Sequence, residues 1–146
     1  MTTVYKLKDY KQTMKFQKDF PSSFKWDERY KTYLLSQKDG IQGIWIVDGN
    51  NILAEAILSW NSDNVLNIES FIVDEAHRKQ GVGTHLLSEV ISWANQMEYT
   101  HITGMVPRQG WTMHLFKNFN AKFLVEHRNW KACRAIYVSF YISIKK

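Results

Sequence analysis

The stretch Arg78-Lys79-Gln80-Gly81-Val82-Gly83 joins an apolar run, Leu66 to Val73, to a long amphipathic pattern, Val82 to Met97. The run predicts a β-strand and the pattern predicts a helix, so the glycines stand where the helix begins. The first N–H groups of a helix have no partner within it and carry partial positive charge, and small residues let an anion approach them. Arg78 and Lys79 add cationic side chains. We therefore expect this loop to bind a phosphorylated ligand.

Short strands and helices are expected on both sides of this loop. Upstream, the patterns predict a strand over Thr3 to Lys8, helices over Tyr10 to Phe20 and Trp26 to Gln37, and strands over Ile44 to Val47, Ile52 to Leu58 and Val65 to Val73. Downstream, they predict helices over Val82 to Met97 and Trp111 to Phe119, and strands over His101 to Val106, Lys122 to Trp130 and Ala135 to Ser143.

The connections between these elements indicate the fold class. Turn residues separate the three strands between Ile44 and Val73, which predicts that these strands are antiparallel. The strand after the long helix should return parallel to its predecessor through a right-handed crossover. We expect the order β α α β β β α β α β β, an α/β (α+β) fold with a mixed, mostly antiparallel sheet and helices on both faces. One domain is expected over residues 1–146.

The composition bounds the function. The 146 residues are 45% hydrophobic and 23% charged, which is typical of a globular protein in water. No apolar run has membrane-spanning length, and the first residues lack the pattern of a signal peptide, so we expect a cytoplasmic protein with no membrane association. Cys133 is the only cysteine and the histidines are dispersed, so no metal site is expected.

The net charge is +5 with a pI of about 9.3, which favours anionic ligands. The basic residues are spread along the chain, as on a solvated surface. A basic nucleic-acid-binding domain is therefore disfavoured but stays open as an alternative.

The glycine loop fits neither of two well-known phosphate motifs. A Walker loop is excluded, because no Gly-Lys-Ser or Gly-Lys-Thr follows. A dinucleotide fingerprint needs three spaced glycines within a doubly wound sheet, whereas this loop follows an antiparallel meander. A glycine-containing turn that only permits close packing of strand and helix is the remaining structural alternative.

From Ile68 to Leu87 the chain resembles the GNAT superfamily of acyl-CoA-dependent N-acyltransferases. The match comprises the strand before the loop, the spacing from Val73 to Arg78, the loop, and the Leu86-Leu87 pair after it. The resemblance implies the family fold over nearly the whole chain, and acetyl-CoA (coenzyme A) as co-substrate. It implies that the pyrophosphate binds at Arg78, Lys79, Gln80, Gly81, Val82, Gly83 and Thr84.

The same resemblance implies a path for the pantetheine arm. The arm would pair with the edge of Phe71, Ile72 and Val73, in an opening between that strand and the strand from His101 to Val106. Gln109 stands where the family often has an asparagine that contacts the arm; a plain loop residue is the alternative.

Glu69 is the candidate catalytic residue. Amide formation needs a neutral amine, so a general base is useful, and a carboxylate in an apolar strand is disfavoured unless it has a partner or a role. In some polyamine and amino-sugar acetyltransferases of the family, a glutamate at the matching place acts as base or binds the acceptor. A solvent-facing glutamate, or one paired with a core arginine, is the alternative.

Phe116 stands where the family often has a tyrosine that protonates the leaving thiolate. Phe116 has no proton to give, although a thiolate with a pKa near 8.5 can leave without a strong acid. A nearby hydroxyl, His114 or water could serve instead. The alternative is a catalytically impaired protein of the same fold that binds coenzyme A or a macromolecular partner. The class of the amine acceptor is not readable from the sequence, and a homodimer stays open.

Overall fold

The computed structural model describes residues 2–7, 10–19, 41–60, 64–78, 80–108, 110–128 and 136–144. The predicted helix over Trp26 to Gln37 lies outside the described residues, as do Lys79, Gln109 and Cys133.

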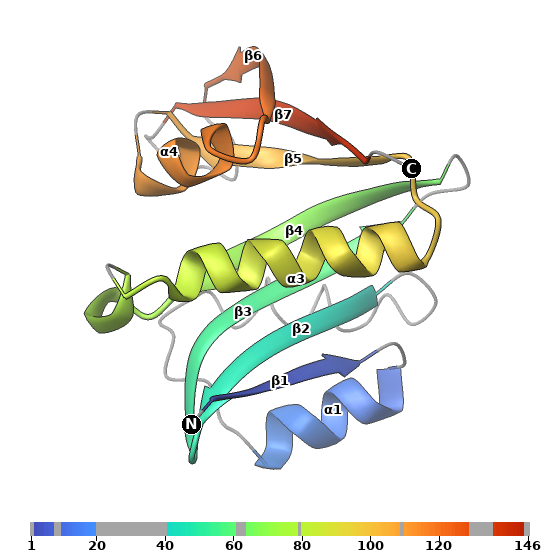
Figure 1. Ribbon diagram of the computed structural model, residues 1–146, viewed down its shortest axis with the longest axis vertical. Helices are drawn as coiled ribbons and strands as arrows, with labels where there is room; N and C mark the ends of the chain where they lie inside the picture. Colours follow the sequence, from blue (N-terminus) through green and yellow to red (C-terminus); the bar gives the residue numbers. More distant parts are fainter. Residues whose placement is uncertain are drawn as a thin grey trace.

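A single seven-stranded sheet connects the described segments, in the order β1-β2-β3-β4-β5-β7-β6. The strands are β1 (Thr2–Leu7), β2 (Ile41–Asp48), β3 (Asn51–Trp60), β4 (Val65–Val73), β5 (His101–Pro107), β6 (Lys122–His127) and β7 (Tyr137–Ser143). Within the described chain, β4 and β5 form the parallel pair and the other pairs are antiparallel. Figure 1 shows β4 and β5 diverging from a common end. The predicted mixed, mostly antiparallel sheet is confirmed.

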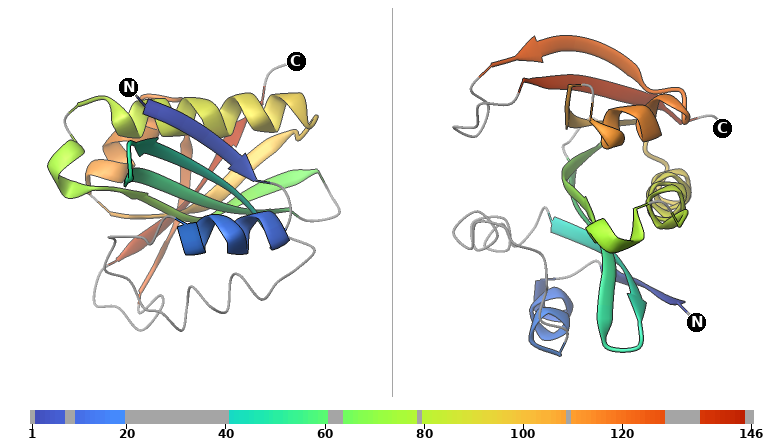
Figure 2. Two further views of the ribbon diagram at one scale, coloured as in Figure 1. Left: turned by 90° about the horizontal axis from the view of Figure 1, so that it is seen from below. Right: turned by 90° about the vertical axis from the view of Figure 1, so that its left-hand side faces the viewer.

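Helices cover both faces of this sheet, as expected (Figure 2). Helix α1 (Tyr10–Asp19) lies on one face, where the Phe16 ring packs 4.7 Å from the Trp45 ring, centroid to centroid. Helices α3 (Val82–Gln96) and α4 (Trp111–Lys117) lie on the other face and close the main core. The buried residues that α3 contributes to this core are Gly83, Leu86, Leu87, Val90, Trp93 and Ala94.

Some predicted element ends were wrong. Met97 lies just beyond the end of α3 and is 42% exposed, so it does not continue the core-facing stripe. Helix α4 ends at Lys117 rather than Phe119, and β6 ends at His127. The short 3₁₀ helix η1 (Glu75–His77) between β4 and the glycine loop was not predicted, because a single turn leaves no periodic pattern.

A β-bulge at Glu69 interrupts β4. Ile57 of β3 pairs with Ser70, and the next residue, Leu58, pairs with Ile68, so Glu69 has no register partner on β3. An extra residue of this kind bends the strand and increases its twist. The bulge therefore changes the direction of β4 at Glu69.

The pairing of β4 with β5 ends at the same point. The parallel register runs from Val65 opposite His101 to Ile68 opposite Gly104 and stops there, while both strands continue. Beyond Ile68 no other described strand takes the place of β5 beside β4. The expected opening between these two strands is therefore present, and the bulge lies where it begins.

Candidate active site

The divergence of β4 and β5 opens into a cavity of about 590 Å³. Its walls come from β4 between Ile68 and Ile72, from β5 between Met105 and Pro107, from α4, and from Arg78 and Tyr137. Of the residues that the sequence singled out, four line the cavity: Glu69, Phe71, Ile72 and Arg78. Val73 is buried, with 1% of its surface exposed.

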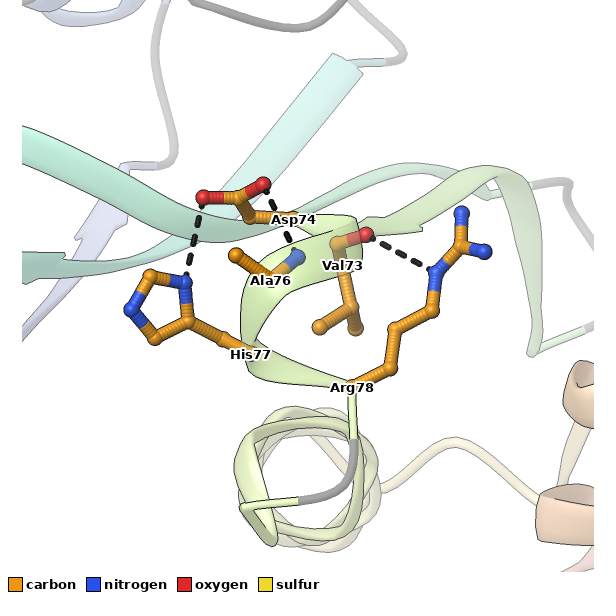
Figure 3. Close-up of polar contacts among 5 residues, drawn as sticks. All are labelled: Val73, Asp74, Ala76, His77 and Arg78. Atoms are coloured by element: carbon orange, nitrogen blue, oxygen red, sulfur yellow. Dashed lines mark hydrogen bonds and ion pairs between the residues drawn. The ribbon is translucent and has the colours of Figure 1, made fainter.

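The segment after β4 is held by its own side chains (Figure 3). The Asp74 carboxylate accepts from the Ala76 N–H at 3.4 Å and contacts Nδ1 of His77 at 3.1 Å. On the other side of the turn, Nε of Arg78 donates to the Val73 carbonyl at 3.3 Å. These contacts fix the direction in which the chain leaves β4 and enters the glycine loop.

The positive charge of Arg78 lies at the wall of the cavity. Its guanidinium carbon is 5.1 Å from the centroid of the Trp111 ring, a cation–π contact. Both side chains line the cavity. The Trp111 ring and the Val73 carbonyl thus both hold the guanidinium of this exposed residue beside the cavity.

Gly81 forms the N-terminal end of α3 in a conformation suited to glycine. Its φ of 79° lies in the left-handed region, and a Cβ there would meet no described heavy atom within 4 Å. The first helical bond runs from the His85 N–H to the Gly81 carbonyl, at 3.0 Å. The N–H groups of Val82, Gly83 and Thr84 therefore precede the helical ladder, and no described side chain caps this end. Free N–H groups at a helix N-terminus are a geometry at which proteins in general bind anions.

Gly83 has a different structural reason to be glycine. A Cβ at this position would lie 3.2 Å from Leu115 and 3.2 Å from Trp111, both on α4. The absence of a side chain thus lets α3 and α4 come together. The packing alternative raised by the sequence applies to Gly83, whereas Gly81 faces open space.

Glu69 is held by two neutral donors at the start of the opening. Its Oε1 accepts from the Ser59 hydroxyl at 2.6 Å and from Nδ2 of Asn67 at 2.8 Å. Thr103 donates in turn to Oδ1 of Asn67 at 3.0 Å. Glu69 is half-buried, so it is not the solvent-facing residue that the sequence left open.

A second cavity, of about 470 Å³, meets the first at Glu69. Both cavities are lined by Ile68, Glu69, Met105 and Tyr137. The second cavity adds the polar side chains of Asn67, Thr103 and Ser139. Glu69 therefore lies where the two cavities meet.

Phe116 is a core residue as well as a cavity wall. It is fully buried, and its ring makes edge contacts with Phe71 and Phe140 at 5.0 and 4.9 Å between centroids. The hydroxyl-bearing residues that line the same cavity are Ser70, Thr112 and Tyr137. His114 is exposed and does not line it, which weakens the case for His114 as a proton donor.

Four contributing residues were missed by sequence reasoning: Ser59, Asn67, Thr103 and Tyr137. Ser59 and Asn67 interrupt apolar strands as Glu69 does, which was the available signal. Among the tryptophans, Trp111 lines the cavity. The side chains of Trp26, Trp60 and Trp130 lie outside the described part of the chain.

Three further observations concern metal ligands, membrane-spanning helices and another groove. In the described ranges, no three His, Cys, Asp or Glu side chains are grouped so that they could hold a metal ion. No described helix is both long and apolar enough to cross a membrane. A larger groove, of about 920 Å³, lies between α3 and β7, but it is remote from the glycine loop and lined by neither Glu69 nor Arg78.

One family of known proteins matches the sequence. The sequence profile described as "Acetyltransferase (GNAT) family" matches residues 7–120. No curated protein sequence matches the chain.

Solved structures share the fold at low identity. The ribosomal-protein-S18-alanine N-acetyltransferase of Escherichia coli superposes with a TM-score of 0.77 at 16% identity, over 100% of this chain and 96% of that one. Ard1 of Thermoplasma volcanium gives 0.76 at 13% identity, over 99% of each chain. An acetyltransferase of Bacillus subtilis, solved in complex with CoA, gives 0.70 at 12% identity, over 99% of this chain and 100% of that one. With a family profile that matches most of its length and a fold that agrees, the chain belongs to the GNAT family of acetyltransferases.

Proposed function

We propose that the protein is an acyl-CoA-dependent N-acyltransferase that moves an acetyl group from acetyl-CoA to an amine by direct attack. The observation that carries the proposal is the end of β4–β5 pairing at Ile68 and Gly104. It opens a cavity with the Arg78 guanidinium in its wall and the Glu69 carboxylate where the strands part. The Arg78 guanidinium suits an anionic, thioester-bearing ligand, and the Glu69 carboxylate suits an amine.

The donor would bind along β4 and the glycine loop. The pyrophosphate would accept from the N–H groups of the loop from Lys79 to Thr84, with Arg78 supplying charge. The pantetheine arm would lie along Phe71 to Val73, in the place that β5 leaves. Gln109 remains a predicted contact. Structural relatives solved with acetyl coenzyme A and with CoA agree with this choice of ligand.

Glu69 would act on the acceptor amine. The carboxylate takes a proton from the ammonium group, and the neutral nitrogen attacks the thioester carbonyl carbon. The C–N bond forms, the C–S bond breaks with its electron pair on sulfur, and the nitrogen loses its second proton. The thiolate takes up one proton from water or from a hydroxyl in the cavity. The balance is one amide, one coenzyme A thiol and one proton released.

One observation favours a second function. Phe116 is an apolar core residue at the place where a proton donor is frequent in the family, so the chain could bind coenzyme A or a macromolecule without transferring an acyl group. Tight binding of coenzyme A with no acetylated product from any amine would support that function over the first.

The test combines binding and turnover. Calorimetry with coenzyme A measures the cofactor site. Release of free thiol is then followed with acetyl-CoA and a panel of amines: a peptide with a free α-amino group, spermidine, an aminoglycoside and L-lysine. We expect saturable binding and at least one acetylated amine. No binding at millimolar coenzyme A would refute the proposal. The proposal also includes a single domain over residues 1–146 and a cytoplasmic location. It leaves open whether the protein forms a homodimer.

A further inference from the structure

A row of polar side chains crosses three neighbouring strands beside Glu69. Ser59 on β3 is in register with Asn67 on β4, and Asn67 is in register with Thr103 on β5. All three are half-buried, in a sheet whose neighbouring positions Leu58, Leu66 and Ile102 are fully buried and apolar. Polar groups at such positions require hydrogen-bond partners, and here they supply one another.

The hydrogen bonds in this row point in one direction. The Thr103 hydroxyl donates to Oδ1 of Asn67 at 3.0 Å, and Nδ2 of Asn67 donates to Oε1 of Glu69 at 2.8 Å. An ionised carboxylate only accepts, so the amide nitrogen must face Glu69 and the amide oxygen must face Thr103. A flipped amide would place oxygen against oxygen at Glu69. The carboxylate therefore decides which way the amide faces, and the Thr103 hydroxyl, by donating to Oδ1, holds Asn67 in the orientation that donates to Glu69.

Ser59 completes the arrangement. Its hydroxyl donates to the same Oε1 atom at 2.6 Å, so two donors from different strands converge on one carboxylate oxygen. Glu69 has no register partner on β3, and these two contacts tie its side chain to β3 and β4. Both donors are neutral, so neither cancels the negative charge that a base needs.

The row also faces the place where an acceptor would bind. Asn67, Glu69 and Thr103 all line the second cavity, and Glu69 lines the first as well. We propose that Ser59, Asn67 and Thr103 are positioning residues that hold the Glu69 carboxylate at the junction of the two cavities. The inference rests on the proposed function, in which Glu69 takes a proton from the amine.

The test uses Thr103, whose hydroxyl reaches Glu69 through Asn67. Thr103→Val keeps the side-chain shape and removes the donor; Thr103→Ser keeps the donor. With acetyl-CoA and the amine of the panel that reacts fastest, kcat should fall about threefold to tenfold in Thr103→Val, the range for one neutral hydrogen bond. KM for acetyl-CoA should stay within about twofold, and Thr103→Ser should restore most of the rate.

Two controls separate positioning from loss of structure. Thr100→Val makes the same change at an exposed threonine outside the row, which donates to the Asn64 carbonyl at 3.4 Å, and should leave kcat unchanged. In a Glu69→Gln background, Thr103→Val should have no further effect, because the residue acts through the carboxylate. Thermal melting of each variant verifies that it is folded.

The outcomes separate failure of the positioning role from failure of the proposed function. If Glu69→Gln lowers kcat but Thr103→Val behaves like Thr103→Ser, the positioning inference is overturned and the proposed function stands. If Thr103→Val lowers kcat equally with and without the Glu69 carboxylate, the row is structural and the inference also fails. If the parent acetylates no amine, the proposed function fails and the inference fails with it.

Discussion

Replacing Gly81 by Asp should weaken the binding of coenzyme A about 30-fold. Gly81 lies at the N-terminus of α3, and a Cβ there would meet no described heavy atom within 4 Å, so the introduced carboxylate has room. We take about 6 Å as the separation between that carboxylate and each phosphate of a pyrophosphate at the first turn. With an effective dielectric constant of about 50, each repulsion is worth about 1 kcal/mol. Two of them sum to about 2 kcal/mol, or about 30-fold in Kd.

Two further variants isolate the charge from the backbone strain. Gly81→Asn has nearly the same shape and tolerates a positive φ, so it should bind coenzyme A within a few-fold of the parent. Gly49→Asp introduces the same acid into the β2–β3 turn, where φ is 61° and a Cβ likewise meets no described atom within 4 Å. That variant has equivalent strain, yet it should leave the affinity unchanged.

Isothermal titration calorimetry at low salt is the assay, repeated at about 1 M salt, where the screening length falls to about 3 Å. The difference between Gly81→Asp and Gly81→Asn should shrink at high salt. If Gly81→Asp binds coenzyme A as tightly as Gly81→Asn, the pyrophosphate does not bind at the first turn of α3, and the assignment of the loop is refuted.

Three further perturbations test other parts of the structure. Glu69→Gln should lower kcat by about 100-fold, the lower range for a lost general base, with an unchanged calorimetric Kd for acetyl-CoA; equal kcat values would remove Glu69 from the chemistry. Phe116→Ala should lower the free energy of unfolding by about 3–4 kcal/mol in urea titrations, because the ring is fully buried against Phe71; a loss under 1 kcal/mol would contradict this packing. Lys6 lies 2.7 Å from Glu89, and its hydrogen bond lowers the pKa of that carboxyl from its ordinary value. Lys6→Met should therefore cost about 0.5 kcal/mol of stability at neutral pH, and the difference from the parent should vanish as the pH falls through the lowered pKa of Glu89; a difference that persisted at lower pH would rule out the ion pair as its source.

The junction of β4 and α3 was predictable because its signals are local. An apolar run, a glycine-containing loop and a helical stripe stand in direct succession, and β4 and α3 begin where these patterns begin. Glycine at position 81 fits its backbone conformation, because its φ is positive and glycine adopts positive φ without steric cost. The predicted parallel return of β5 followed from the long helical connection between the two strands rather than from any residue in β5.

The details of the site were harder to predict because they depend on pairing between distant segments. The bulge at Glu69 exists only relative to the register of β3, which the sequence of β4 does not contain. The contacts of Glu69 with Ser59 and Asn67 follow from that register. Glycine at position 83 stays a predicted phosphate contact through its backbone, and its missing side chain also accommodates α4, which local sequence could not reveal. The local sequence thus indicated Glu69 as the carboxylate of the site, and strand pairing determined which side chains hold that carboxylate.

A crystal structure with bound acetyl-CoA tests the central claim most directly. The account predicts the pyrophosphate at the first turn of α3, the pantetheine arm along Phe71 to Val73, and the thioester beside Glu69, between β4 and β5. Acetyl-CoA bound instead in the groove of about 920 Å³ between α3 and β7, with the opening beside Glu69 empty, would contradict it.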